Sequence, residues 1–189
     1  MIASVKKFMP EVFVISNDPQ ELTAIMSGLR EQLGARSDSV SIATFDSYEA
    51  AMQAYSERVH RDEQAGISQK GKPVAMNRPF LIIMGNEEHE SLSGGQRAFA
   101  EVVRSDNESK KSAPANRTEM FRLTARQRDA EGMADIVDNQ LFGLTMYYEP
   151  SKNDKPAAIQ SLVNKAAKYL VAIIDGLDGL SPGGKSRGK

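Results

Sequence analysis

The stretch PFLIIMG, from Pro79 to Gly85, decides the fold. It is the most hydrophobic run in the chain, and it is short. A short apolar run that ends at turn residues is typical of a strand buried on both faces of a sheet. Similar runs lie on both sides of it along the chain. We therefore expect five strands, at Glu11–Ser16, Val40–Phe45, Pro79–Met84, Met120–Ala125 and Leu141–Tyr148.

Helical patterns separate these runs. The first has a clear start, because Asp18 can cap a helix, Pro19 suits the first helical position and Glu21 lies three residues after the cap. Apolar residues then recur at helical spacing as far as Gly34, where the helix is expected to stop. Asp46 or Ser47 can cap the second helix. The remaining expected helices are Gly95–Arg104, Arg128–Gln140 and Pro156–Leu177.

Strands that alternate with helices indicate right-handed crossovers and a parallel sheet covered on both faces, which is a three-layer αβα fold of the α/β class. We expect one domain over residues 1–178. The segment Ser105–Thr118 has almost no apolar residues and is predicted to be a flexible insertion, either a partner-recognition segment or a tolerated linker. Residues 179–189 are predicted to be a disordered tail.

Composition narrows the function. The chain has 189 residues, a formal net charge of −1 and no cysteine, so thiolate metal sites and cysteine nucleophiles are excluded. The near-zero charge gives no global attraction for nucleic acid or anionic membranes. No uninterrupted apolar run reaches the length of a membrane span, and Pro10 and Glu11 interrupt the apolar start. We expect a cytoplasmic protein without a cofactor.

Five short motifs in the right order resemble the receiver domain of bacterial response regulators, over about residues 10 to 178. The resemblance implies a flavodoxin-like sheet of strand order 2-1-3-4-5. The motifs are VFVISNDPQEL (Val12–Leu22), FDSYEAAM (Phe45–Met52), PFLIIMG (Pro79–Gly85), LTA (Leu123–Ala125) and YYEPSKNDKPAAI (Tyr147–Ile159).

A receiver uses carboxylates to hold a hard cation, an aspartate to accept a phosphoryl group, and a lysine to pair with it. The chain departs from this pattern. Ser16 and Asn17 replace the acidic pair, Gly85 stands at or next to the acceptor position, and Glu149 replaces the lysine before Pro150. Only Thr124 matches, in the position of the switch threonine or serine. We therefore expect a degenerate receiver, a pseudo-receiver, that is not an enzyme.

The remaining polar residues have simpler interpretations. We expect Asp18 to be a helix cap rather than a metal ligand, and Thr124 to bond to backbone. Glu87, Glu88 and Glu90 are expected to form a solvated loop, with a weak cation site beside Asp18 as the alternative. Because the chain has no cysteine, a zinc site at His60 or His89 is not expected. The Gly-Gly pair in SLSGGQ (Ser91–Gln96) lacks the lysine of a phosphate-binding loop.

Three functions remain open. The first is a phosphorylation-independent signalling or scaffold module of a two-component system that binds protein partners and forms a homodimer. The resemblance implies that such contacts use the fourth helix, fifth strand and fifth helix. The final helix carries more apolar positions than packing on the sheet requires. The expected interaction surface comprises Met146, Tyr147, Ile159, Leu170, Ile174 and Leu177.

The second function is the N-terminal regulatory domain of a transcriptional regulator. The basic tail offers only Lys185, Arg187 and Lys189, and no helix-turn-helix signature follows the last helix, so we do not expect direct binding to nucleic acid. The third is a flavodoxin-like cofactor binder. The loop after the first strand argues against it, since Pro19 lacks an amide donor and no cluster of hydroxyl residues and glycines follows.

Overall fold

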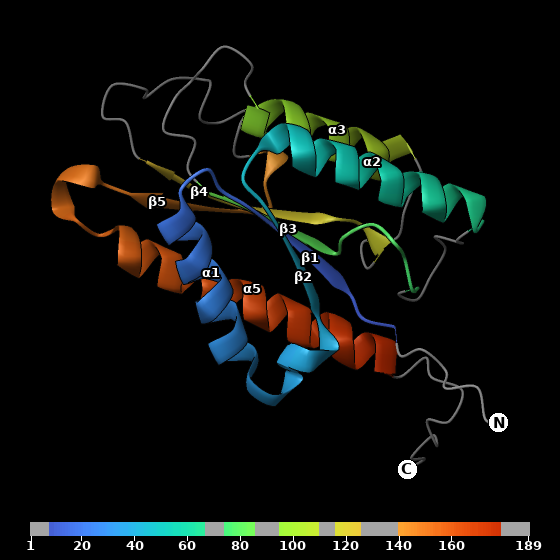
Figure 1. The fold of residues 1–189 in the computed structure, drawn as a ribbon, viewed down its shortest axis with the longest axis horizontal. Coiled ribbons are helices and arrows are strands. Elements are labelled where there is room, and N and C mark those ends of the chain that lie inside the picture. The colour runs from blue at the N-terminus through green and yellow to red at the C-terminus, as the bar shows by residue number, and fades with distance from the viewer. Residues whose placement is uncertain (1–7, 67–73, 86–94, 110–115, 126–139, 179–189) are drawn as a thin grey trace.

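A single parallel sheet forms the centre of the molecule (Figure 1). The structure, a computed structural model, describes residues 8–66, 74–85, 95–109, 116–125 and 140–178. The strand order is β2-β1-β3-β4-β5, which confirms the expected α/β fold and flavodoxin-like topology. The strands are β1 (Glu11–Ile15), β2 (Ser41–Phe45), β3 (Leu81–Met84), β4 (Glu119–Ala125) and β5 (Leu144–Tyr148).

Helices cover both faces of this sheet, and so three layers result. Helices α1 and α5 pack on one face, and α2 and α3 pack together on the other (Figure 1). The helices are α1 (Pro19–Leu33), α2 (Tyr48–Gln64), α3 (Gly95–Ser109) and α5 (Lys155–Asp178), with short 3-10 turns η1 (Gly34–Ser39) and η3 (Pro150–Lys152). Most of the predicted helix Arg128–Gln140, and the predicted tail, lie outside the described residues.

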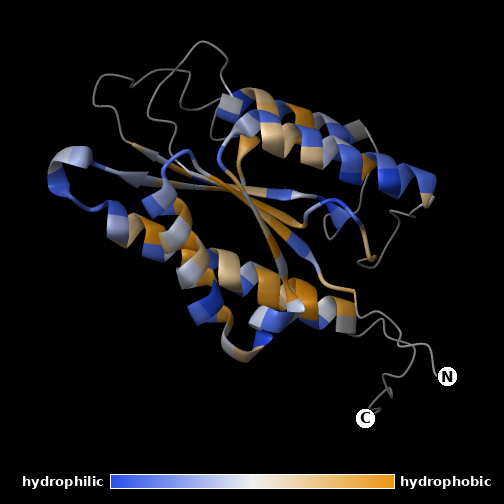
Figure 2. Cartoon of the chain, viewed as in Figure 1, coloured by the Kyte–Doolittle hydropathy of each residue, from blue (hydrophilic) through white to orange (hydrophobic). Residues whose placement is uncertain are grey.

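Alternation along the central strands builds two cores. In β1, Val12 and Val14 contribute to the core under α1 and α5, whereas Phe13 and Ile15 contribute to the core under α2 and α3. All four side chains are fully buried. Figure 2 shows hydrophobic residues along the central strands, and a mixture of hydrophobic and hydrophilic residues on the helices that flank them. A strand buried on both faces needs apolar residues at every position, which explains the runs seen in the sequence.

The predicted start of α1 is confirmed in detail. Asp18 is the N-cap, and its Oδ1 accepts a hydrogen bond of 2.9 Å from the backbone amide of Gln20. Gly34 ends the helix with a φ of +54°, a conformation that glycine adopts without strain. Of the two candidate caps of α2, the structure selects Ser47, whose hydroxyl accepts from the amide of Ala50.

Helix α3 is longer than predicted. We expected it to end at Arg104 and a flexible insertion to follow, but it continues to Ser109. Polar contacts rather than apolar burial order its last turn. Asp106 pairs with buried Arg78, and the Asn107 side chain forms two hydrogen bonds with the backbone of Thr118. Asn116 and Thr118, also within the predicted insertion, are buried. Residues 110–115 lie outside the described residues.

Strand β5 is shorter than predicted, because it begins at Leu144 rather than Leu141. Leu141 and Phe142 are instead buried in the core beneath α2 and α3. The chain joins the sheet at Gly143, whose amide donates to the carbonyl of Met120 at 2.9 Å. The carboxylate end of the Glu119 side chain lies where a side chain at position 143 would project, so a larger residue there would have to displace it.

Helix α5 turns its apolar side inward. Leu170 is fully buried and Ile174 is 5% exposed, both in the core shared with α1. The expectation that these two residues form an interaction surface is therefore wrong, because packing on the sheet uses their whole side chains. The helix is long and apolar enough to cross a membrane by length and composition, yet half of its most apolar window is buried in the protein. That is the pattern of a core helix.

A buried ionic network closes the end of the sheet where the strands begin. The Arg78 side chain is 1% exposed and pairs with Asp106 at 2.6 Å and with Asp62 at 3.6 Å. Its guanidinium also donates to the carbonyl of Asn116 at 3.3 Å, and the Tyr55 hydroxyl donates to Asp106 at 3.0 Å. Because Asp62 belongs to α2 and Asp106 to α3, one arginine joins both helices to the sheet.

Replacing Arg78 tests this role. We expect Arg78→Met to lower the free energy of unfolding by about 3 kcal/mol or more, since it leaves two carboxylates buried without their cation. Urea denaturation of the purified chain measures the change. Arg97→Met is the matched control, because its ion pair with Glu101 is exposed and should be worth less than about 1 kcal/mol. Equal, small losses for both variants would contradict a structural role for Arg78.

Candidate functional site

The ends of β1 and β3 meet at the centre of the sheet, where a parallel α/β fold places its functional residues. Ser16 follows β1 and is 3% exposed. Gly85 follows β3, and its amide donates to the carbonyl of Ile15 at 2.7 Å. Two of the positions identified from the sequence as degenerate, Ser16 and Gly85, are thus brought side by side, and both are buried.

The side chain of Glu21 fills the space between them. Ser16 donates a hydrogen bond from Oγ to Glu21 Oε1 at 2.8 Å. A Cβ atom at position 85 would collide with the same Glu21 oxygen and would lie 2.8 Å from Ser16 Cβ. Glycine at position 85 is therefore a steric requirement of this arrangement. A carboxylate delivered by α1 occupies the place where a side chain on β3 would project.

Lys155, at the start of α5, neutralises this carboxylate. Its Nζ lies 2.8 Å from Glu21 Oε2 and 3.3 Å from Asp18 Oδ2. The Glu21 side chain is 0% exposed and that of Lys155 is 24% exposed, so the pair is largely removed from water. We call Ser16, Asp18, Glu21, Gly85 and Lys155 the Glu21 cluster. It joins the first turns of α1 and α5.

Two pKa shifts follow from this geometry. Burial alone would lower the pKa of Lys155, but pairing with Glu21 and Asp18 raises it above its ordinary value. Burial alone would raise the pKa of Asp18, but backbone hydrogen bonds from Gln20 and Glu21, together with Lys155, lower it. Both shifts favour the charged forms. Lys155 and Asp18 are consequently charged at neutral pH.

The carbonyl of Gly85 is held from the opposite face of the sheet. The Tyr48 hydroxyl of α2 donates to it at 3.2 Å, and the Gln96 side-chain amide of α3 donates at 3.0 Å. Gly85 thus has the Glu21 carboxylate on the α1 side and two hydrogen-bond donors on the α2 and α3 side. Its position is fixed by three helices.

The other predicted site residues do not join the cluster. Glu149 points to Lys152, with a distance of 2.9 Å between carboxylate and ammonium. Asn17 is exposed. Thr124 lies near the end of β4, paired in register with Tyr147. Its hydroxyl forms no hydrogen bond to any described residue, so the expected bond to backbone is not found within them.

The structure also bears on metal and phosphate binding. Asp18 acts as the helix cap, as expected. Within the described ranges, no group of three or more His, Asp or Glu side chains is placed to hold a metal ion. The amides at the start of α1 are already used, because that of Asp18 bonds to Ser16 Oγ and that of Gln20 to Asp18. His60 is exposed, whereas His89 and Glu87, Glu88 and Glu90 lie outside the described residues.

Sequence reasoning missed Glu21 and Lys155. We interpreted Glu21 only as a sign of a helix start. Yet it lies four and eight residues before Ile25 and Leu29, so helical periodicity places it on the same buried stripe. Lys155 precedes Pro156, so a lysine–proline step follows β5 six residues after the position where the receiver lysine was expected. The signal available in the sequence was a charged residue on the inward face of each of two helices, Glu21 in α1 and Lys155 in α5.

Both polar groups at the centre of the cluster have partners within the protein. The Glu21 carboxylate is held between Ser16 and Lys155. The hydroxyl of Ser16 is also buried and donates to Glu21.

A double-mutant cycle tests the packing of the cluster. We expect Gly85→Ala to lower the free energy of unfolding by about 1–3 kcal/mol, because the new methyl group meets Glu21 and Ser16. In a Glu21→Ala background the penalty should fall by about 1 kcal/mol or more, since the main obstacle is gone. Urea denaturation of the four proteins measures this coupling. Additive losses would show that Glu21 does not occupy the space beside Gly85.

A pH series tests the ion pairs. The raised pKa of Lys155 adds stability that is complete below its ordinary value of 10.5 and is lost as pH rises through the higher, folded-state pKa. The stability gap between the wild type and Lys155→Gln should thus be constant near neutral pH and should shrink above pH 10.5. Lys152→Gln, whose ammonium is exposed, serves as control and should show a smaller gap. A gap that does not change with alkaline pH would contradict the assignment.

The stability contributed by Asp18 depends on pH in the opposite direction, because it is lost as pH falls. The lowered pKa of Asp18 adds stability that is complete above its ordinary value of 3.8 and is lost as pH falls through the lower, folded-state pKa. The stability gap between the wild type and Asp18→Asn, which keeps a capping side chain, should therefore close at acidic pH. Urea denaturation across the acidic range measures it, and a gap that persists in acid would exclude an ionic contribution from Asp18.

Comparison with known proteins places the fold. A scan of protein-family models gave no match, and a search of curated protein sequences gave none. Among solved structures, the phosphorylated cyanobacterial phytochrome response regulator RcpA is 15% identical, with a TM-score of 0.50 over 87% of this chain and 95% of that chain. A response regulator receiver domain from Rhodospirillum rubrum is 10% identical, also at a TM-score of 0.50, over 84% of this chain and 94% of that chain. The chain therefore has the fold of a response-regulator receiver domain.

Proposed function

We propose that this chain is a signalling module that works without phosphorylation, a pseudo-receiver that acts through protein–protein contacts in the cytoplasm and catalyses no reaction. One observation carries the proposal. The Glu21 carboxylate lies beside Gly85 and is paired with Lys155, so protein side chains fill the place that would have to receive a phosphoryl group. The receiver fold itself supports a role in signal transduction.

We place the proposed contact surface at the outer edge of the sheet. Among the strands that the structure describes, β5 pairs only with β4, and Met146 and Tyr147 on it are partly exposed. Ile159 and Leu177 of α5 are also partly exposed, although Ile159 packs against the core under α1 and α5. The backbone edge of an outer strand can pair with another chain. We therefore propose a homodimer formed along β5 with the adjoining surface of α5.

Treatment with a phosphodonor tests the first half of the proposal. The full chain is incubated with acetyl phosphate and magnesium, and its intact mass is measured. We expect no gain of a phosphoryl group, because the Glu21 cluster has neither a free carboxylate nor space for a phosphoryl group. A stoichiometric gain at any residue of the cluster would overturn phosphorylation independence.

Sedimentation tests the second half. We expect the wild type to dimerise at high micromolar concentration, and Tyr147→Glu to shift it toward monomer by placing a charge at the contact. Val102→Glu is the matched control, since Val102 is 42% exposed on α3, on the other face of the sheet. A wild type that stays strictly monomeric, or two variants that behave alike, would count against a dimer along β5.

A further inference from the structure

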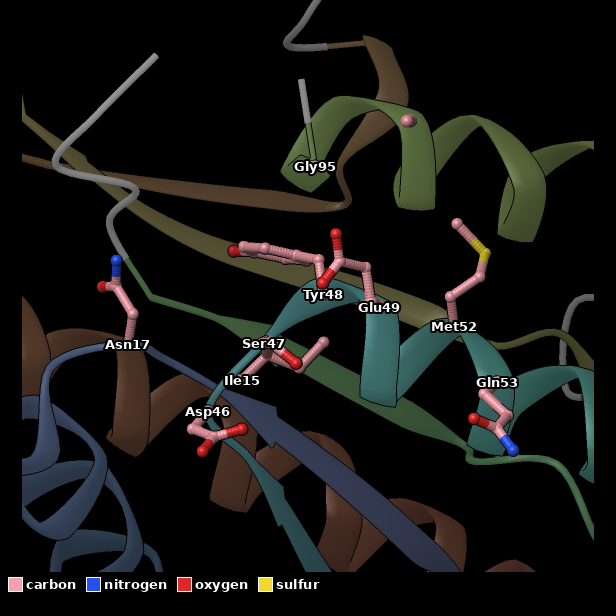
Figure 3. A pocket seen from close by; sticks show the side chains of 10 residues that line it. Ile15, Asn17, Asp46, Ser47, Tyr48, Glu49, Met52, Gln53 and Gly95 are labelled. Atoms are coloured by element: carbon pink, nitrogen blue, oxygen red, sulfur yellow. The ribbon is translucent and has the colours of Figure 1, made fainter. Parts of the chain in front are cut away.

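A second feature lies beside the Glu21 cluster, on the opposite face of the sheet. It is a pocket of about 560 Å³ between the first turns of α2 and α3, at the ends of β1 and β2 (Figure 3). This volume falls in the range of sites that hold small organic molecules, roughly 300–1,000 Å³. Its lining residues are Ile15, Asn17, Asp46, Ser47, Tyr48, Glu49, Met52, Gln53, Gly95 and Ala98.

Part of the pocket lining is apolar. Met52 and Tyr48 are partly buried and pack against the core under α2 and α3, to which the fully buried Ile15 also belongs. Figure 3 shows Glu49 and Met52 extending from α2 toward α3, with the Tyr48 ring lying sideways at the start of α2. The Tyr48 ring has a fixed position, because its hydroxyl bonds to the carbonyl of Gly85 at 3.2 Å. A rigid aromatic wall of this kind suits an apolar or aromatic ligand.

The rim of the pocket is acidic. Asp46 and Glu49 are exposed carboxylates, and neither forms an ion pair or side-chain hydrogen bond with any residue that the structure describes. None of the ten lining residues is Lys, Arg or His. Ser47 already caps the helix start, by accepting from the amide of Ala50. Among the described residues, the charge at the mouth is therefore negative.

We propose that this pocket binds a small organic cation, an amine or guanidinium group attached to an apolar body of about the size of one aromatic ring. The apolar part would contact Met52 and the ring of Tyr48. The cationic group would lie between Asp46 and Glu49, where two carboxylates attract it and repel an anion. A cation near the face of Tyr48 gains further from the ring quadrupole.

A metal ion fits the pocket less well. Hard divalent cations take six or more oxygen ligands, whereas the pocket offers two exposed carboxylates, one before α2 and one in its first turn. The apolar side chains of the lining offer no oxygen ligands to such an ion. The inference depends neither on dimerisation nor on the absence of phosphorylation, because it rests on the pocket alone.

Titration of the isotope-labelled full chain with phenethylamine, followed by backbone amide shifts, tests the proposal. We expect saturable shifts at Asp46–Gln53, at Gly95–Ala98 and at Gly85, which Tyr48 connects to the pocket. The neutral analogue 2-phenylethanol should bind about tenfold more weakly, as expected for the loss of two ion pairs. The anionic analogue 3-phenylpropionate should give no saturable shifts there.

Substitutions of pocket residues distinguish the contribution of charge to ligand affinity from the contribution of shape. Glu49→Gln and Asp46→Asn should each weaken phenethylamine about two- to fivefold and leave 2-phenylethanol unchanged. Glu31→Gln, an exposed change on α1, should alter neither. Ala98→Phe, which fills the pocket, should abolish both. The proposal is overturned if phenethylamine gives no saturable shifts, if 3-phenylpropionate binds as well, or if Glu49→Gln and Asp46→Asn leave its affinity unchanged.

Discussion

The ion pair between Glu21 and Lys155 determines the arrangement of the strand ends. A buried carboxylate is tolerated only with a cation and hydrogen bonds, and Lys155 and Ser16 supply both. Because the carboxylate comes from α1 and the ammonium from α5, the pair also fixes how these helices meet. Gly85 follows as a consequence, since only a residue without a side chain leaves room for Glu21.

The two ends of the sheet are closed by the same kind of interaction. At the start of the strands, Arg78 joins α2 and α3 through Asp62 and Asp106. At their ends, Lys155 joins α1 and α5 through Asp18 and Glu21. Each helical layer therefore has its own charged connection, at opposite ends of the molecule. The apolar cores set the layers, and these ionic contacts set the positions of helices within them.

The sequence predicted what apolar periodicity controls. It indicated five strands, the caps of α1 and the parallel topology, because buried strands and amphipathic helices have direct signatures. It failed where polar residues are ordered by distant partners. The last turn of α3 depends on Arg78, which lies 28 residues from Asp106 in the sequence. The Glu21 cluster likewise joins residues more than a hundred positions apart, and a single sequence does not pair them. Two apolar residues of α5 that were attributed to a partner surface, Leu170 and Ile174, belong to the core.

The carboxylate beside Gly85 also limits which residues this position accepts. An aspartate at position 85 would add a second buried carboxylate beside one ammonium, in space that fits a glycine. A side chain there becomes compatible with the fold only when Glu21 changes as well. Positions 21 and 85 are therefore coupled, although they belong to different elements.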